Sequence, residues 1–147
     1  MFILQETPLD VLQIQNTHRN SHSGAMTAFE GIVRADKHPG KDVSSLLYIA
    51  DQPACVKEGN LIIQEVTALY PDIKAICVQR IGQVNAGETA IWIGAWSAHR
   101  DEAFKGCRYI IEEVKKRLII WKKESFTDGS SAWVHGPQQT SIRIDTF

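Results

Sequence analysis

The sequence lacks the features that mark several classes of protein. Its three cysteines are widely spaced and form no Cys-x-x-Cys pair, so neither a disulfide scaffold nor a cysteine zinc site is predicted. No apolar run approaches the roughly 18 residues that a membrane span requires. The formal net charge of −1 lacks the basic footprint of a nucleic-acid binder. No glycine-rich phosphate loop and no Ser or Cys nucleophile motif is present.

The 147 residues are enough to bury one core, and no linker divides them, so a single domain spanning 1–147 is expected. The first ten residues have no basic region and reach Pro8 and Asp10 early, unlike a signal peptide, which predicts a cytoplasmic protein. The Gly/Ser/Pro-rich stretch 125–141 predicts a mobile loop. We therefore expect 135–147 to be a mobile C-terminal segment, with 142–147 as a last strand or tail.

Hydrophobic periodicity predicts a mixed order of strands and helices, which indicates an α+β fold. A β-hairpin is expected around Asn85-Ala86-Gly87, and its second arm is apolar on both faces, as in a central, covered strand. The predicted strands are 27–34, 43–50, 73–84 and 88–97, and the predicted helices are 54–70 and 101–117.

The helix 101–117 carries one apolar stripe with a lysine at its edge. Lys115 lies about 40° from Ile111 around the helix, and Arg108 falls on the same edge. Partial burial and a neighbouring cation both lower the pKa of a lysine, which favours a neutral amine at Lys115. The alternative is a lysine that buries its stem and shows its charge to water. The stripe consists of Phe104, Cys107, Ile111, Val114 and Leu118.

Cations are concentrated in residues 100–124, which hold eight Lys or Arg against five Asp or Glu and thus indicate a local anion site. His99 and Arg100 lie where the covered strand ends and the helix begins. Free backbone N–H groups and the helix dipole make such a junction a phosphate site. The alternative is that Arg100 pairs with Asp101 or Glu102 and that His99 has a structural role.

Three other candidates carry a weaker signal. Arg34 follows a predicted buried strand, and Phe29 on that strand has the position of a core residue. His18 and His22 have a spacing that could suit a metal, but no carboxylate lies nearby, so no metal site is predicted.

Several segments in chain order resemble the large, catalytic subunit of molybdopterin synthase. They are "FEGIVR", "QRIGQVNAGE", "SAHRDEAF", "VKKRLIIWKKE" and Trp133-Val134, and together they span most of the chain.

This resemblance implies an enzyme, a sulfurtransferase of molybdenum cofactor biosynthesis with no cofactor of its own. It would convert cyclic pyranopterin monophosphate (precursor Z) to molybdopterin. The sulfur would arrive as the C-terminal Gly-Gly thiocarboxylate of a small ubiquitin-like partner subunit. The implied assembly is a homodimer within a heterotetramer. The implied fold is an α/β hammerhead with an additional antiparallel β-subdomain.

The resemblance also implies roles for residues at matching positions. Lys115 is implied as general acid/base or transient nucleophile toward the thiocarboxylate carbonyl. Lys122 is implied as the group that holds anionic substrate and stabilises developing charge. The implied pterin and phosphate contacts are Arg34, His99, Arg100 and Phe29, with Leu118–Trp121 as an apolar wall between the two lysines.

The sequence departs from the family pattern at Ile49, Asp51, Gln79 and Ile119 and in the tail around Pro137. Arg143 could replace an arginine that other members offer near the C-terminus. Two alternatives remain open: a catalytically silent binding protein that keeps the partner groove, and an unrelated phosphate-metabolite enzyme built on His99 and Arg100.

Overall fold

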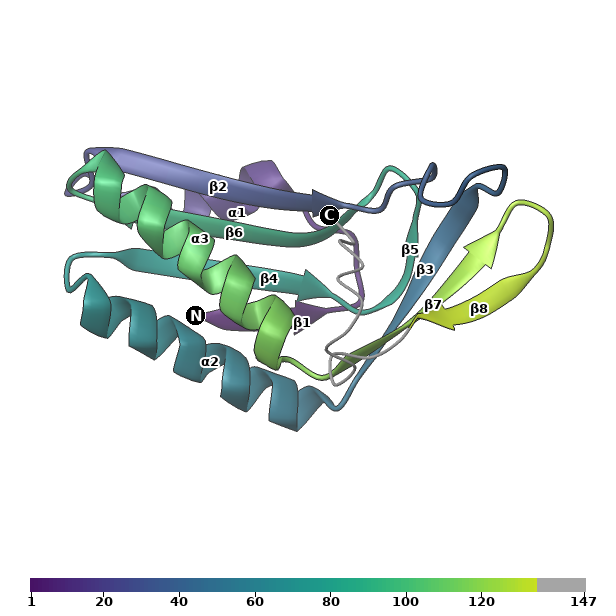
Figure 1. Cartoon of the computed structure of the whole chain (residues 1–147). Coiled ribbons are helices and arrows are strands. Elements are labelled where there is room, and N and C mark those ends of the chain that lie inside the picture. The colour runs from purple at the N-terminus through teal and green to yellow at the C-terminus, as the bar shows by residue number, and fades with distance from the viewer. Residues whose placement is uncertain (135–147) are drawn as a thin grey trace.

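The computed structural model describes residues 1–134, which form two four-stranded sheets and three helices (Figure 1). The predicted α+β fold with an additional antiparallel β-subdomain is confirmed. The elements are β1 (Phe2–Gln5), α1 (Val11–His18), β2 (Ala25–Ile32), β3 (Val43–Ala50), α2 (Gln52–Leu69), β4 (Lys74–Arg80), β5 (Gly82–Asn85), β6 (Thr89–Ser97), α3 (Arg100–Arg117), β7 (Ile120–Phe126) and β8 (Ser131–Val134).

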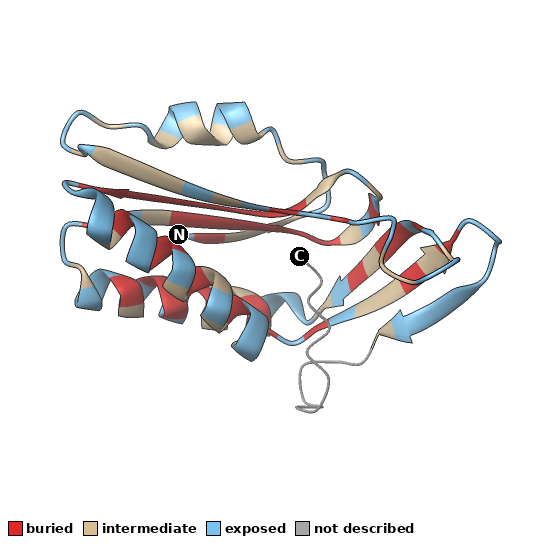
Figure 2. Cartoon of the chain, turned by 45° about the horizontal axis from the view of Figure 1, so that its top comes forward, coloured by how far each residue is buried: buried red, intermediate tan, exposed pale blue. Residues whose placement is uncertain are grey.

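The first sheet is a layer between helices. Its strand order is β1-β4-β6-β2, and β1 pairs with β4 in parallel while the other pairs are antiparallel. Helices α2 and α3 cover one face and α1 covers the other (Figures 1 and 2). The sequence did not predict β1 or α1, because an element of four or eight residues carries too few positions to show a period.

Strand β6 is buried along almost its whole length, which confirms the predicted central, covered strand (Figure 2). Its side chains alternate between two cores. Trp92 and Trp96 pack toward α1, with ring centroids 6.2 Å apart. Ile91 and Ile93 join the core beneath α2 and α3. Burial on both faces explains why the strand reads as continuously apolar.

The second sheet has the order β5-β3-β7-β8 and is antiparallel throughout. Strand β7 starts two residues after α3 ends and pairs with β8 through a turn in which Phe126 N–H donates to the Ser130 carbonyl at 2.8 Å. The prediction of a mobile loop is therefore wrong for 125–134. The predictions for 135–147, Pro137 and Arg143 concern residues outside the described range.

The predicted hairpin of 73–84 with 88–97 is only partly correct. Strand β4 pairs with β6 as expected, but the chain turns at Ile81 and leaves the first sheet. Gly82 has φ 80°, a backbone conformation that side-chain-bearing residues rarely adopt. Beyond it, β5 pairs with β3 in the second sheet. One continuous apolar stretch of sequence thus contributes a strand to each of the two sheets.

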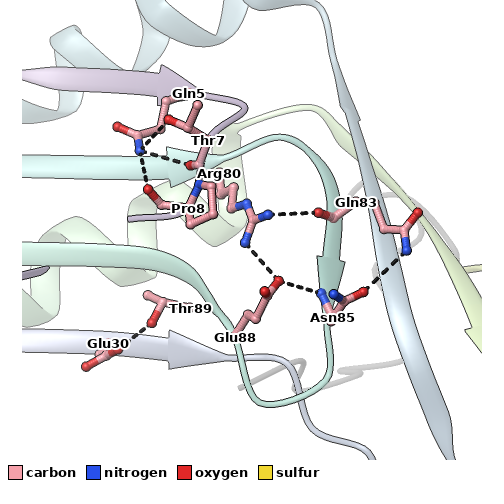
Figure 3. Close-up of polar contacts among 9 residues, drawn as sticks. All are labelled: Gln5, Thr7, Pro8, Glu30, Arg80, Gln83, Asn85, Glu88 and Thr89. Atoms are coloured by element: carbon pink, nitrogen blue, oxygen red, sulfur yellow. Dashed lines mark hydrogen bonds and ion pairs between the residues drawn. The ribbon is translucent and has the colours of Figure 1, made fainter. Parts of the chain in front are cut away.

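Arg80 stabilises this corner between the two sheets by hydrogen bonds (Figure 3). Its guanidinium donates to the Glu88 carboxylate at 2.9 Å and to the Gln83 carbonyl at 3.2 Å. The same Glu88 carboxylate accepts from the Asn85 N–H at 2.9 Å. One buried arginine therefore links β4, β5 and the turn before β6, which fixes how the second sheet leaves the first.

Helix α3 is rotated relative to the predicted stripe. Phe104, expected in the core, is 62% exposed, whereas Gly106 and Ile110 are buried. A Cβ atom on Gly106 would lie 2.1 Å from the Ile73 side chain, so the absence of a side chain lets α3 approach closely. A stripe scored on large residues misses a face built partly from glycine and alanine.

No helix within the described 134 residues is long and apolar enough to cross a membrane.

Trp92→Ala tests the two-sided burial of β6. Trp92 is 1% exposed, and we expect its truncation to lower the unfolding free energy by about 3–5 kcal/mol. Trp133→Ala is the matched control, because Trp133 is 56% exposed and its loss should cost less than about 1 kcal/mol. Urea unfolding measures both variants, and equal effects would contradict the assignment.

Candidate active site

Lys115 and Lys122 lie on either side of the connection from α3 to β7. Leu118 caps the helix, donating its N–H to the Val114 carbonyl at 3.1 Å, and the chain then reverses into β7. Of the predicted wall, Leu118 and Ile120 are buried, whereas Ile119 and Trp121 point outward and are exposed. The wall thus consists of alternate residues, as strand geometry requires.

The side chain of Lys122 is half-buried, and its Nζ lies 5.8 Å from the ring centroid of Tyr48, its cross-strand partner. Burial lowers the pKa of the Lys122 amine to about 8, assisted by the positive charges of Lys115 and Lys37 and opposed by Glu124. A substantial fraction of this amine is therefore neutral near physiological pH, which suits proton transfer.

Lys115 itself is exposed, so the prediction of a half-buried Lys115 is wrong. The rotation of α3 explains the difference. The core line runs through Ile110 and Val114, and Lys115 turns about 100° away from Val114. Lys115 and Lys122 are nevertheless close enough that the positive charge of Lys115 lowers the pKa of Lys122. The amine with the lowered pKa is Lys122.

Three further polar residues at this site, Lys37, His38 and Glu124, were not among the predicted ones. Lys37 Nζ lies 3.0 Å from Glu124 Oε1, and His38 donates from Nε2 to Glu124 Oε2 at 2.7 Å. Lys37 and His38 belong to a Lys-His-Pro-Gly stretch, a composition that is typical of a loop. The sequence gave no sign that this loop folds back onto β7, a contact between residues 86 positions apart.

A groove of about 480 Å³ runs between β2 and α3 and reaches Lys115. Phe29 lies on one side of it, half-buried at the edge of the core, and its role as a wall of the substrate site stays a prediction. On the other side, Arg108 donates to Glu112 at 2.8 Å. The groove therefore combines apolar walls with charge at its rim. Its lining residues are Thr27, Ala28, Phe29, Phe104, Cys107, Arg108, Ile111, Glu112 and Lys115.

Arg34 follows β2, whose last residues lie at the same end of the molecule as the end of α3 (Figure 1). Its side chain is exposed. Backbone hydrogen bonds anchor both neighbours: Val33 donates to the Glu88 carbonyl at 3.1 Å, and the Ala35 carbonyl accepts from Val43 at 2.9 Å. The backbone therefore fixes where the Arg34 side chain begins.

His99 and Arg100 lie at the opposite end of α3. His99 is the N-cap residue, and Asp72 secures the junction by accepting from the Ala98 N–H at 3.0 Å. Within residues 1–134 Arg100 forms no ion pair, and Asp101 pairs with Lys105 instead at 2.7 Å. At 1.5 Å per residue, His99 and Lys115 are about 24 Å apart along the helix. One chain does not bring the two groups together.

The positions of Gln79, Ile49 and His18 in the structure are clear. Gln79 is buried and donates to the carbonyls of Arg80 and Ala90 at 2.9 and 3.1 Å. Ile49 is on the outer face of the second sheet, opposite Trp121. His18 contacts the Ile14 carbonyl at 2.8 Å and packs on Trp96. None of these side chains points to the lysine site.

The two-sheet fold, with three helices packed on its first sheet, indicates the class of protein. The chain superposes on molybdopterin synthase from Staphylococcus aureus with a TM-score of 0.85 and 30% identity, covering 91% of this chain and 96% of that one. It shares its fold with a complex of subunits 1 and 2 of molybdopterin-converting factor from Helicobacter pylori (TM-score 0.76, 17% identity, 90% and 89% covered).

Sequence comparison identifies the family. The family model described as MoaE protein matches residues 4–117. A molybdopterin synthase catalytic subunit from Nostoc sp. is 34% identical over 90% of this chain and 81% of the relative. The chain belongs to the MoaE family of molybdopterin synthase catalytic subunits, and the resemblance inferred from its motifs is confirmed.

We expect the Lys122 amine to titrate near pH 8, below the 10.5 of an ordinary lysine. Carbon-13 NMR of lysine-labelled protein follows each Cε signal with pH, and Lys122→Arg assigns the resonance. Between pH 8 and 10.5, Lys122 is protonated to a greater extent in the unfolded chain than in the folded one. Raising the pH from 8 toward 10 should therefore stabilise wild type relative to Lys122→Met. A Lys122 midpoint near 10.5 would contradict the assignment.

Proposed function

We propose that this chain transfers sulfur from the C-terminal thiocarboxylate of a small ubiquitin-like partner subunit to cyclic pyranopterin monophosphate, forming the dithiolene of molybdopterin. The observation that carries the proposal is the Lys122 amine, with a pKa of about 8, beside Lys115, which lines a groove with apolar walls. Both ligands are anions, and this end of the molecule holds the positive charge that they require.

We assign different tasks to the two lysines. Lys115 is exposed and lines the groove, so an incoming tail can reach its amine, which contacts or attacks the thiocarboxylate carbonyl. Lys122 is half-buried and accepts or returns the proton, because its pKa lies close to the working pH. Each sulfur leaves a thiocarboxylate whose carbonyl carbon gains an oxygen atom from water or from the substrate oxygen that the sulfur replaces. The tail therefore ends as a carboxylate, no oxidant is needed, and two tails are consumed for each dithiolene.

The groove between β2 and α3 is the proposed pterin site. Its volume of about 480 Å³ falls within the range of ordinary small-molecule pockets, roughly 300–1,000 Å³. Phe29 and Ile111 supply apolar walls, and Arg34, two residues after the end of β2, is proposed to contribute a cation. His99 lies about 24 Å from Lys115 along α3, so in one chain His99 and Arg100 do not reach the two lysines. We propose that a second copy of the chain in a homodimer supplies them.

The proposed assembly is a heterotetramer, in which each chain of the homodimer binds one small subunit. The Helicobacter pylori protein of the same fold is a complex of two different subunits, which supports a partner of this kind. We also propose a cytoplasmic location, which suits the three free, buried thiols of Cys55, Cys77 and Cys107.

Lys115→Ala should lower single-turnover formation of the dithiolene by about 10²-fold or more, because the residue that meets the thiocarboxylate is lost. The assay mixes the chain, a thiocarboxylated small subunit and cyclic pyranopterin monophosphate. Lys116→Ala is the matched control, since Lys116 is the next lysine along α3 and is exposed. The fold and the partner complex should survive in both variants. A wild-type protein that binds the partner but forms no product would leave a binding protein as the better description.

Mixed dimers test the shared site. Lys115→Ala and Arg100→Ala should each be nearly inactive alone, because each dimer then lacks a group at both sites. Refolding the two variants together produces some dimers in which one site is complete, so about a quarter of the sites should recover activity under random pairing. Failure of the mixture to exceed either variant, with mixed dimers verified by mass, would contradict a site built from two chains.

A further inference from the structure

The loop after Arg34 is attached to β7 by a buried ion pair. Lys37 Nζ lies 3.0 Å from Glu124 Oε1, and each of the two side chains is only 5% exposed. His38, 42% exposed, bonds the other carboxylate oxygen at 2.7 Å and packs edge-on against Phe126. Hydrogen bonds from Lys37 and His38 outweigh burial and hold the pKa of Glu124 below its usual value, so Glu124 is a carboxylate.

Stability alone is a weak reason for such a pair. Removing two charges from water costs several kcal/mol for each ion, and their mutual attraction often does no more than offset this cost. Apolar residues of similar size are frequently as stable in the same place. A buried lysine and glutamate therefore call for an explanation from their surroundings, and the nearest feature of chemical interest is Lys122.

Glu124 and Lys122 project from the same face of β7, because side chains two residues apart on a strand point the same way. Their cross-strand partners on β3 are Leu46 and Tyr48, each 2% exposed. The two charged groups thus share an apolar wall that keeps water away and strengthens the interaction between them.

The charged and titratable groups that act on Lys122 come from several elements. Lys115 approaches from α3 and Lys37 from the loop, and both positive charges lower its pKa, after the larger effect of burial. Glu124 on β7 raises it. Tyr48 on β3 stays a neutral phenol, because burial raises its own pKa. Lys37 and Glu124 therefore act on one amine in opposite directions.

We propose that Lys37 and Glu124 are positioning residues of the sulfur-transfer site, whose ion pair fixes the loop after Arg34 against β7 and sets the charge of the Lys122 amine. Neither residue need touch substrate. The relevance to turnover rests on the proposed function, whereas the effect on Lys122 does not. Because His38 bonds the same carboxylate, it belongs to this unit as the member nearest to solvent.

The experiment compares the titration midpoint of Lys122, followed by carbon-13 NMR of lysine-labelled protein, in two variants. Glu124→Gln removes the negative charge and should lower the midpoint by about half a pH unit or more. Lys37→Met removes a positive charge and should raise it by a similar amount. Lys116→Met, an exposed lysine on α3, is the control and should leave the midpoint unchanged. Midpoints that do not move, or that move in the same direction, would overturn the proposal.

Two further, conservative variants distinguish an effect of charge from a loss of fold. Lys37→Arg keeps the charge and should retain the wild-type midpoint, and Glu124→Asp should lower it less than Glu124→Gln does. The pH profile of single-turnover sulfur transfer should shift in the same directions as the NMR midpoints. If wild type transfers no sulfur but the midpoints shift as expected, the proposed function fails and the tuning of Lys122 stands.

Discussion

The site depends on keeping one amine partly out of water beside other positive charges. Burial disfavours the charged form of an amine, and the pKa of Lys122 is accordingly lowered to about 8. Tyr48 and Leu46 supply the dry side, and Glu124 limits how far the pKa falls. The same surroundings that make the amine reactive would bind an anionic substrate, because a negative charge relieves the repulsion between the lysines.

The two-sheet architecture makes this environment possible. Gly82 turns the chain out of the first sheet, and Arg80 holds the corner through Glu88 and Gln83 (Figure 3). Strand β3 then receives β5 on one edge and β7 on the other. Because β7 follows α3 after only two residues, the last turn of the helix and the inner face of the second sheet share one short connection. Lys115 and Lys122 meet there.

Helix α3 separates the remaining candidates. Because an α-helix rises 1.5 Å per residue, His99 and Arg100 at its start lie about 24 Å from Lys115 near its end. A phosphate held at the first end cannot reach the lysines of the same chain. A homodimer in which the start of one α3 meets the end of another would complete two equal sites, as two-fold symmetry requires. The geometry of one chain thus supplies a physical reason for the proposed assembly.

Sequence by itself determined several of the local elements and the family. Strand β3 was predicted with its observed bounds, and the covered character of β6 followed from its apolar faces. The motifs around Lys115 and Lys122 identified the family. These features are local, because they depend on the periodicity or identity of neighbouring residues.

Only the tertiary structure decided the rest. The rotation of α3, which exposes Lys115, results from the close approach of Gly106 to Ile73. The break of one apolar stretch into β4 and β5 depends on a partner strand, β3, in another part of the chain. The lowered pKa of Lys122 and the Lys37–Glu124 pair come from residues many positions apart. The burial of an atom, and the effect of charges on it, depend on all the residues that the fold brings around it. A local pattern in the sequence does not include those residues.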